Sequence, residues 1–179
     1  RNAGADPYLS AFLAIVEAIL GTPLMDEIAV GNRANMSRDD WNRVRAAMGN
    51  QKMLGLDYYS GGHLTHGYRF NISAQFFDAH NYSVSRETGL LDYDELEAQA
   101  EEIKPLILLA GYSAYPRKVD FRRMKEIADN VGAVLMVDMA HFAGLVAGDV
   151  LEGDFNPKHF AEVMTTTTHK TLRGPRGGS

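Results

Sequence analysis

The chain reads Pro105-Leu-Ile-Leu-Leu-Ala110, continues through Val119 to Asn130, and then reads Val131-Gly-Ala-Val-Leu-Met-Val137. The first and third runs are short and almost entirely apolar, which predicts strands buried on both faces of a sheet. The middle segment places Met124 and Ile127 at helical spacing, which predicts a helix with one apolar side. A strand, a helix and a second strand in this order predict a right-handed crossover between parallel strands.

The same alternation extends toward the start of the chain. Lys52-Met-Leu-Gly-Leu56 predicts a short strand, residues 70–84 show strand-like alternation broken by turn residues, and residues 92–102 predict an acidic amphipathic helix. Apolar spacing predicts two further helices, over residues 9–20 and 37–48. We therefore expect an α/β fold with a mainly parallel (mixed) sheet flanked by helices.

The composition excludes several classes of protein. The chain has 179 residues, enough for one domain with a buried core, a net charge of −5 and no cysteine. It has no long basic patch and no apolar run of membrane-spanning length, so we expect neither nucleic acid nor a membrane as a partner. The abrupt start at Arg1 and end at Ser179 lead us to expect an internal fragment of a cytoplasmic enzyme.

Two residues carry the chemistry. The stretch Thr165-Thr-Thr-Thr-His-Lys-Thr-Leu-Arg-Gly-Pro-Arg-Gly-Gly-Ser179 begins with four β-branched residues, which predict a strand, and places Lys170 just after it, where a Schiff-base lysine belongs. Asp138 ends an apolar strand. A lysine that can hold an aldehyde and an aspartate that can hold a ring nitrogen favour pyridoxal 5′-phosphate (PLP) as cofactor. The alternatives are a solvated loop lysine and an aspartate that caps a helix.

The predicted topology brings these residues together. Ser113, Asp138 and Lys170 all follow predicted strands, and ligands of open α/β sheets bind beyond the carboxyl ends of strands. A zinc site at His63 and His66 is the main metal alternative. The pair has no cysteine partner and no evident third ligand, so we expect no metal site.

Four motifs resemble those of one enzyme family. They are Gly61-Gly-His-Leu-Thr-His-Gly67, Gly111-Tyr-Ser-Ala-Tyr115, Val137-Asp-Met-Ala-His-Phe-Ala-Gly-Leu-Val-Ala147 and residues 165–178. In collinear order over nearly the whole chain, they resemble serine hydroxymethyltransferase (glycine hydroxymethyltransferase). The resemblance implies that residues 1–179 are the large PLP-binding domain of a fold-type I transferase, without the N-terminal arm and the C-terminal small domain of that family.

The resemblance also implies roles for individual residues. Lys170 would carry PLP covalently, Asp138 would keep the pyridine nitrogen protonated, and His63 would stack on the ring face. His141 and Ser113 would lie beside the phenolic oxygen; their alternatives are a buried core histidine and a turn hydrogen bond. The implied catalytic residues are Lys170, Asp138, His63 and His141, and the implied cofactor-binding residues are these four together with Ser113, Gly4, Ala5, His169 and Thr167.

The phosphate site is the part that departs most from the family pattern. Gly4 and Ala5 precede a predicted helix, whose free amides and dipole suit an anion. However, Ala3 stands where the family has a hydroxyl residue, Tyr8 replaces an asparagine, and Asp6 adds a like charge. We therefore expect weaker binding of PLP than is usual for the family.

The resemblance implies an activity in one-carbon metabolism. The hydroxymethyl group of serine would pass to tetrahydrofolate, giving glycine and 5,10-methylenetetrahydrofolate, in a cytoplasmic homodimer or higher homo-oligomer. One alternative is another fold-type I PLP enzyme, such as a threonine aldolase or a decarboxylase. A further alternative is a catalytically incomplete fragment, and we expect the 179 residues alone to turn over poorly or not at all.

Overall fold

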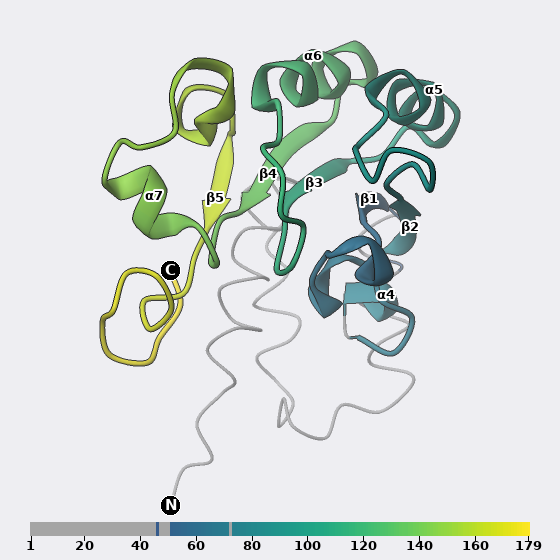
Figure 1. Cartoon of the computed structure of the whole chain (residues 1–179). Coiled ribbons are helices and arrows are strands. Elements are labelled where there is room, and N and C mark those ends of the chain that lie inside the picture. Colours follow the sequence, from purple (N-terminus) through teal and green to yellow (C-terminus); the bar gives the residue numbers. More distant parts are fainter. Residues whose placement is uncertain (1–45, 47–50, 72) are drawn as a thin grey trace, which may run out of the picture.

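The computed structural model describes residue 46 and residues 51–71 and 73–179 (Figure 1). The helix expected over 9–20, nearly all of the helix expected over 37–48, and the predicted phosphate-binding residues Gly4 and Ala5 lie outside the described residues.

The centre of the described part is one sheet of five parallel strands, in the order β2-β1-β3-β4-β5. The α/β fold predicted from the sequence is therefore confirmed, and every strand pair in this part of the chain is parallel. The strands are β1 (Lys52–Leu56), β2 (Asp78–Tyr82), β3 (Ile107–Gly111), β4 (Val134–Asp138) and β5 (Val163–Thr165).

The strands differ in burial according to their place in the sheet. β3 lies between β1 and β4, and all five of its residues are buried, as its apolar sequence predicts. β2 is an edge strand with the polar sequence Asp-Ala-His-Asn-Tyr, and only Tyr82 is buried. An edge strand with polar side chains resists pairing with other chains, and this polarity explains why the strand was predicted only as part of a longer alternating segment.

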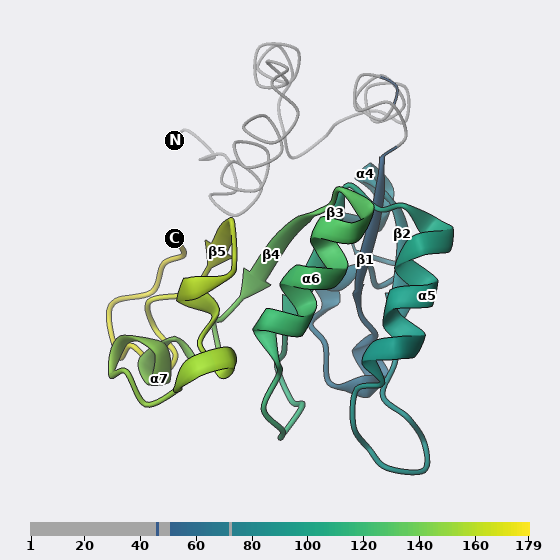
Figure 2. The same cartoon turned by 90° about the horizontal axis from the view of Figure 1, so that it is seen from above.

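Two helices cover one face of the sheet, α5 (Tyr93–Ile103) and α6 (Phe121–Val131), as Figures 1 and 2 show. Each begins at an aspartate whose carboxylate accepts backbone N–H groups of the first turn, Asp92 for α5 and Asp120 for α6, and such caps stabilise a helix by about 1 kcal/mol. Both helices were predicted within two residues of their observed bounds.

The hydrophobic core lies between these helices and the sheet. It contains Leu54 of β1, Leu108 of β3, Leu135 of β4 and the inward side chains Met124 and Ile127 of α6, all fully buried. The remaining helical segments are α4 (Ser73–Phe76), on the opposite side of the sheet, α7 (Ala143–Ala147), and the 3-10 turns η2 (Tyr58–Ser60), η3 (Leu64–His66), η4 (Gly153–Phe155) and η5 (Pro157–His159).

The strand predicted from the four threonines is shorter than expected. β5 ends at Thr165, and the next residues turn back on the C-terminal segment instead. Thr166 exchanges two backbone hydrogen bonds with Ser179, and Thr167 forms an antiparallel bridge with Gly178. Thr166 and Thr167 therefore pair with a short return segment and not with the sheet, and Thr168 already lies in a turn.

The strand order fixes where a ligand can bind. The chain passes from β1 to β2 on one side, and then to β3 on the other side of β1. The connections that follow β1 and β3 therefore lead toward opposite edges of the sheet. Ligands of such sheets usually bind at the carboxyl ends of the two strands between which the direction changes. Within the described residues, none of the helices has the length and apolar character that crossing a membrane requires.

Candidate active site

Loops from four strands meet at the carboxyl edge of the sheet. His63 follows β1, Ser113 follows β3, Asp138 is the last residue of β4, and Lys170 lies in the loop after β5. The first two loops are joined directly, because the backbone N–H of Ser113 donates to the carbonyl of Gly61 at 2.8 Å. The structure therefore brings together the residues that the sequence placed at strand ends.

Glycine makes this junction possible. Gly61 has a φ of +103°, and a Cβ there would lie 2.5 Å from the backbone nitrogen of Tyr115. A Cβ on Gly62 would lie 2.0 Å from the carbonyl oxygen of Leu56. No real Cβ approaches backbone atoms so closely, so the Gly-Gly pair is what allows the loop after β1 to pack against the backbone of Tyr115 and Leu56 just before His63.

Asp138 is held by donors on both of its oxygens. Its Oδ1 accepts the N–H of Ala140 at 3.1 Å, and its Oδ2 lies 3.3 Å from Nε2 of His66. Burial acts to raise the pKa of this carboxyl, but the hydrogen bonds from His66 and from the N–H of Ala140 outweigh burial and lower the pKa below its ordinary value. The carboxylate is thus ionised at neutral pH, and its side chain remains 21% exposed.

His63 is a neutral histidine at the start of η3. Its Nδ1 accepts the backbone N–H of Thr65 at 3.3 Å and lies 2.8 Å from the hydroxyl of Thr65. Because a backbone N–H can only donate, the ring proton is on Nε2. Burial lowers the pKa of His63, the charge of Asp138 opposes this, and Lys170 and other neighbours lower it further.

His141 and Lys170 complete the group. Partial desolvation, and next the positive charge of Lys170, lower the pKa of His141, while the charge of Asp138 raises it. Lys170 therefore acts electrostatically on both His63 and His141. The His141 side chain is exposed, so its alternative as a buried core histidine is wrong.

The loop that carries Lys170 is fixed at several points. Thr168 donates its backbone N–H to Gly177 at 3.0 Å, and Arg173 donates to the carbonyl of Lys170 at 3.1 Å. On the other side, the N–H of Gly144 in α7 donates to the hydroxyl of Thr171 at 3.0 Å, and Figures 1 and 2 show α7 beside this loop. Lys170 therefore lies in a turn that hydrogen bonds hold to the C-terminal segment and to α7.

Thr167 and His169, two polar neighbours of Lys170, differ in whether their side chains have a hydrogen-bond partner. The hydroxyl oxygen of Thr167 is buried and has no hydrogen-bond partner in the described part of the chain, a state that is costly unless a ligand supplies the partner. Nδ1 of His169 lies 3.3 Å from the carbonyl of Gly177, so this nitrogen is the donor. His169 thus contributes to the structure of the loop.

His66 belongs to this site, although from the sequence it was considered only as a zinc ligand, a role that was not expected. It is completely buried and contacts Asp138, which lies 72 positions further along the chain. Both of its ring nitrogens have partners, because Nδ1 accepts the N–H of His63 at 3.3 Å. Neither nitrogen is therefore free for a metal ion, and the described residues contain no group of three or more potential metal-ligating side chains.

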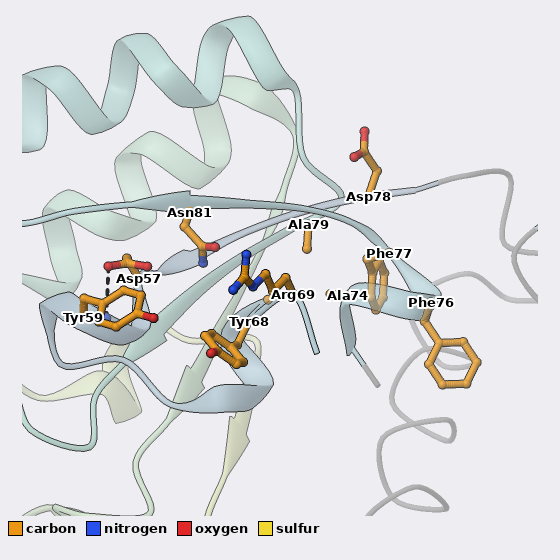
Figure 3. Close-up of a pocket in the computed structure, with 11 residues that line it drawn as sticks. Asp57, Tyr59, Tyr68, Arg69, Ala74, Phe76, Phe77, Asp78, Ala79 and Asn81 are labelled. Carbon is orange, nitrogen blue, oxygen red and sulfur yellow. Dashed lines mark hydrogen bonds between the residues drawn. The ribbon is translucent and has the colours of Figure 1, made fainter. Parts of the chain in front are cut away.

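A separate pocket of about 800 Å³ lies between β2, α4 and the loop that follows β1. Among the residues that line it are Tyr59, Tyr68, Arg69 and Asn81 (Figure 3). It contains none of Lys170, Asp138 or the histidines of the site. It backs onto the site through Asn81, whose amide donates to the carbonyl of His66 at 2.8 Å. We place the candidate active site at the strand ends, because Lys170, Asp138 and the histidines that act on one another electrostatically converge there.

Comparison with known proteins assigns the family. A family model described as serine hydroxymethyltransferase matches residues 31–179. This chain belongs to the serine hydroxymethyltransferase family. Proteins with that name are 57% identical to it in Treponema pallidum, 54% in Mycolicibacterium smegmatis and 46% in Chlamydia trachomatis, over 98%, 99% and 99% of the chain. The chain spans 31%, 36% and 36% of the length of these relatives.

The residues present fit the PLP cofactor of serine hydroxymethyltransferases. The ionised carboxylate of Asp138 has unused lone pairs beyond those taken by Ala140 and His66, which suits a protonated ring nitrogen. Lys170 offers an amine, and the unpartnered hydroxyl of Thr167 offers a polar contact at the same edge. The residues expected to hold the phosphate lie outside the described part.

Proposed function

We propose that the protein transfers the hydroxymethyl group of serine to tetrahydrofolate, giving glycine and 5,10-methylenetetrahydrofolate, with PLP as cofactor. The observation that supports this most is the convergence of Lys170 and the ionised Asp138 on the two neutral histidines, His63 and His141. Membership of the serine hydroxymethyltransferase family favours this activity over those of a threonine aldolase or a decarboxylase. We also propose that residues 1–179 belong to the large PLP-binding domain.

Each residue has a proposed part in holding the cofactor. Lys170 would bind the PLP aldehyde, Asp138 the ring nitrogen, and His63 one face of the ring. His141 and Ser113 would lie near the phenolic oxygen, while Thr167 and His169 would orient Lys170, and Gly4 and Ala5 would contact the phosphate. When bound, PLP supplies an aromatic system that takes up the electrons released when a bond to the amino-acid Cα breaks.

The protein's own groups set the protonation states that this chemistry needs. Because Asp138 stays ionised, it stabilises a proton on a ring nitrogen bound to it. Because burial and nearby positive charge lower the pKa values of His63 and His141, both are neutral near pH 7 and can accept a proton. These two histidines and the Lys170 amine are groups of the proposed site that can carry a proton.

The remaining parts of the proposal rest on the family. The substrates would be serine, glycine and a folate, and the protein would act as a homodimer or higher homo-oligomer in the cytoplasm. One feature supports a homo-oligomer: several large apolar side chains are exposed, including Tyr59 and Phe70.

The test is to map the cofactor chemically. The intact protein is mixed with PLP, its visible absorption band is recorded, and borohydride reduction is followed by peptide mass spectrometry. We expect the modification on Lys170, and its loss in Lys170→Gln but not in Lys118→Gln, which changes an exposed lysine. Modification spread over surface lysines would contradict the cofactor assignment.

A second measurement separates the activities. Serine cleavage is followed with and without tetrahydrofolate. Cleavage that depends on the folate supports hydroxymethyl transfer, whereas equal cleavage without it would instead indicate an aldolase. The 179-residue chain, assayed beside the intact protein, tests the expectation that these residues alone turn over poorly.

A further inference from the structure

We propose that Tyr112 and Phe142 are positioning residues, whose stacked rings hold Ser113 and His141 in place at the carboxyl edge of the sheet. The inference deepens the proposed function and rests on its assignment of Ser113 and His141 to the phenolic oxygen of PLP. Each ring is adjacent in sequence to the residue that it positions. Three observations support the inference: the stack itself, its attachment to the core, and the way in which the two site residues are otherwise held.

The rings of Tyr112 and Phe142 join the loops that follow β3 and β4. Their centroids are 4.7 Å apart and their planes differ by 17°, which is the geometry of a stacked aromatic pair. β3 and β4 are paired as far as Gly111 and Asp138. The stack therefore continues the contact between the two strands into the loops that carry the site.

The stack is attached to the hydrophobic core on both sides. Phe142 is 2% exposed, and its ring lies 6.2 Å from that of Phe121, the first residue of α6. On the other side, the ring of Tyr115 meets that of Tyr112 edge to face at 5.9 Å, and the hydroxyl of Tyr115 accepts the N–H of Leu91 at 3.3 Å. Because side chains in a core are close-packed, one of these rings cannot shift unless its neighbours also move.

The position of His141 depends on the turn that Phe142 closes. The N–H of Phe142 donates to the carbonyl of Met139 at 2.9 Å, and the carbonyl of Phe142 accepts the N–H of Leu145 at 2.9 Å. The imidazole of His141 is exposed and forms no hydrogen bond with any of the described residues. The backbone of the turn therefore positions the imidazole, and Phe142 is the largest buried side chain that fixes this turn to the core.

Ser113 lies in a loop that is tied on its other side. The backbone N–H groups of Ser113 and Ala114 both donate to the carbonyl of Gly61, at 2.8 and 2.9 Å. These hydrogen bonds hold the loop to the segment that follows β1. The ring of Tyr112 supplies the contact in the opposite direction, toward the turn that carries His141. The stack thus keeps Ser113 and His141 at a fixed separation.

The test compares substitutions that keep or remove the stacked rings. Tyr112→Phe keeps the ring, Tyr112→Leu removes it, and Phe142→Leu removes its partner. Phe77→Leu is the control for loss of a buried aromatic side chain, since Phe77 is fully buried and directly follows α4. All variants are made in the intact protein, and thermal unfolding shows which of them keep the fold. Because Tyr112 is only partly buried, Tyr112→Leu should fold and decides the test even where Phe142→Leu does not.

The first readout is the pKa of His141 in the cofactor-free protein, measured by NMR titration of the imidazole signals, with His141→Gln identifying the signal. Partial desolvation and the charge of Lys170 hold this pKa below its ordinary value of 6.5, while Asp138 opposes them. Losing a stacked ring lets the turn move and admits water, so we expect the pKa to rise toward 6.5 in Tyr112→Leu and Phe142→Leu. It should not change in Tyr112→Phe or in the control. Equal pKa values in Tyr112→Phe and a folded Tyr112→Leu would overturn the inference, whether or not the protein uses PLP.

The second readout is the turnover of serine with PLP bound. In Tyr112→Leu, kcat should fall roughly 10- to 100-fold with little change in KM, since a displacement of about 1 Å can cost this much, whereas Tyr112→Phe should keep its kcat. The double variant Tyr112→Leu/Phe142→Leu should be about as slow as the slower single variant, because both substitutions remove the same contact. Losses that multiply would show that the two residues act separately, and would overturn the inference. Absence of any Lys170-bound PLP in the unmodified protein would instead reject the proposed function.

Discussion

Gly111 and Asp138 pair across β3 and β4, and a Cβ on Gly111 would lie 2.0 Å from the carbonyl oxygen of Asp138. Gly111 also has a φ of +103°, which side chains disfavour. The end of β3 thus has to be a glycine for two independent reasons. The residue that it accommodates is the one that carries the carboxylate of the candidate site.

Replacing Gly111 by alanine should therefore damage both stability and the site. The matched control is Gly132→Ala, because Gly132 also has a positive φ, +73°, but its Cβ would meet nothing within 4 Å. We expect the control to lose about 1 kcal/mol of unfolding free energy from the backbone conformation alone. Gly111→Ala should lose about 1–3 kcal/mol more, because the backbone must move to admit the methyl group.

Urea denaturation of the two variants measures this difference. PLP binding to the folded fraction of Gly111→Ala should also be weaker than in Gly132→Ala, since Asp138 is displaced. Equal losses of stability in the two variants would show that the close approach at Asp138 is unimportant.

The stability of the cofactor-free protein should fall as the solution is acidified below pH 6.5. Burial at His63, and partial desolvation together with the charge of Lys170 at His141, give both histidines pKa values below their ordinary value of 6.5. Between the lowered value and 6.5 the unfolded chain binds more protons than the folded chain, so the unfolding free energy decreases with falling pH. Once the pH is below the lowered values, this dependence ends.

Denaturation curves measured at successive pH values test this. His63→Gln and His141→Gln should each reduce the slope between pH 6.5 and the folded-state pKa values, whereas Asn130→Ala, which removes an exposed side chain with no titratable group, should leave it unchanged. The lowered pKa of Asp138 has the opposite character: the stability that it provides is present above its unfolded pKa and is lost only as the pH falls through its folded pKa. If the pH dependence of the unfolding free energy remained in the double variant His63→Gln/His141→Gln, it would not come from these two histidines.

The sequence predicted those parts of the fold that local patterns determine. β3 and β4 are apolar runs that fit a doubly covered sheet, and α5 and α6 each begin at an aspartate cap. The placement of Asp138 at a strand end followed from the same patterns. The carboxyl-edge location of the site then needed only the rule for parallel sheets.

Contacts between distant segments were beyond local patterns. His66 packs against Gly55 of β1, is held by Asn81 of β2, and contacts Asp138 at the end of β4. Its position in the site could therefore be found only once the strands were assembled. The polar edge strand β2 and the early end of β5 have the same cause. In both, tertiary pairing decides a structure that β-propensity alone does not determine.

Asn81→Ala should be more disruptive than its position on an edge strand suggests. The side-chain amide donates to the carbonyl groups of Gly55 and His66, and the substitution leaves both without this partner. We expect a loss of about 1–3 kcal/mol, the usual cost of buried groups left unsatisfied. Asn130→Ala is the control, since Asn130 is exposed and donates only to Glu97. Chemical denaturation compares the two, and equal effects would show that Asn81 does not hold the His66 segment.

The anchoring of the Lys170 loop to α7 should be visible in how readily Lys170 binds the cofactor. The hydroxyl of Thr171 accepts the N–H of Gly144 at 3.0 Å, and a Cβ on Gly144 would lie 2.8 Å from the Thr171 carbonyl. Thr171→Val keeps the shape but removes the acceptor, whereas Thr171→Ser keeps the acceptor. Thr171 is exposed, so we expect a global loss of only about 0.5–1 kcal/mol. The local effect should be larger: Thr171→Val should bind PLP to Lys170 more slowly, and Thr171→Ser at the unmodified rate. Stopped-flow absorbance after mixing with PLP measures these rates, and equal rates for Val and Ser would show that this hydrogen bond does not hold the lysine in place.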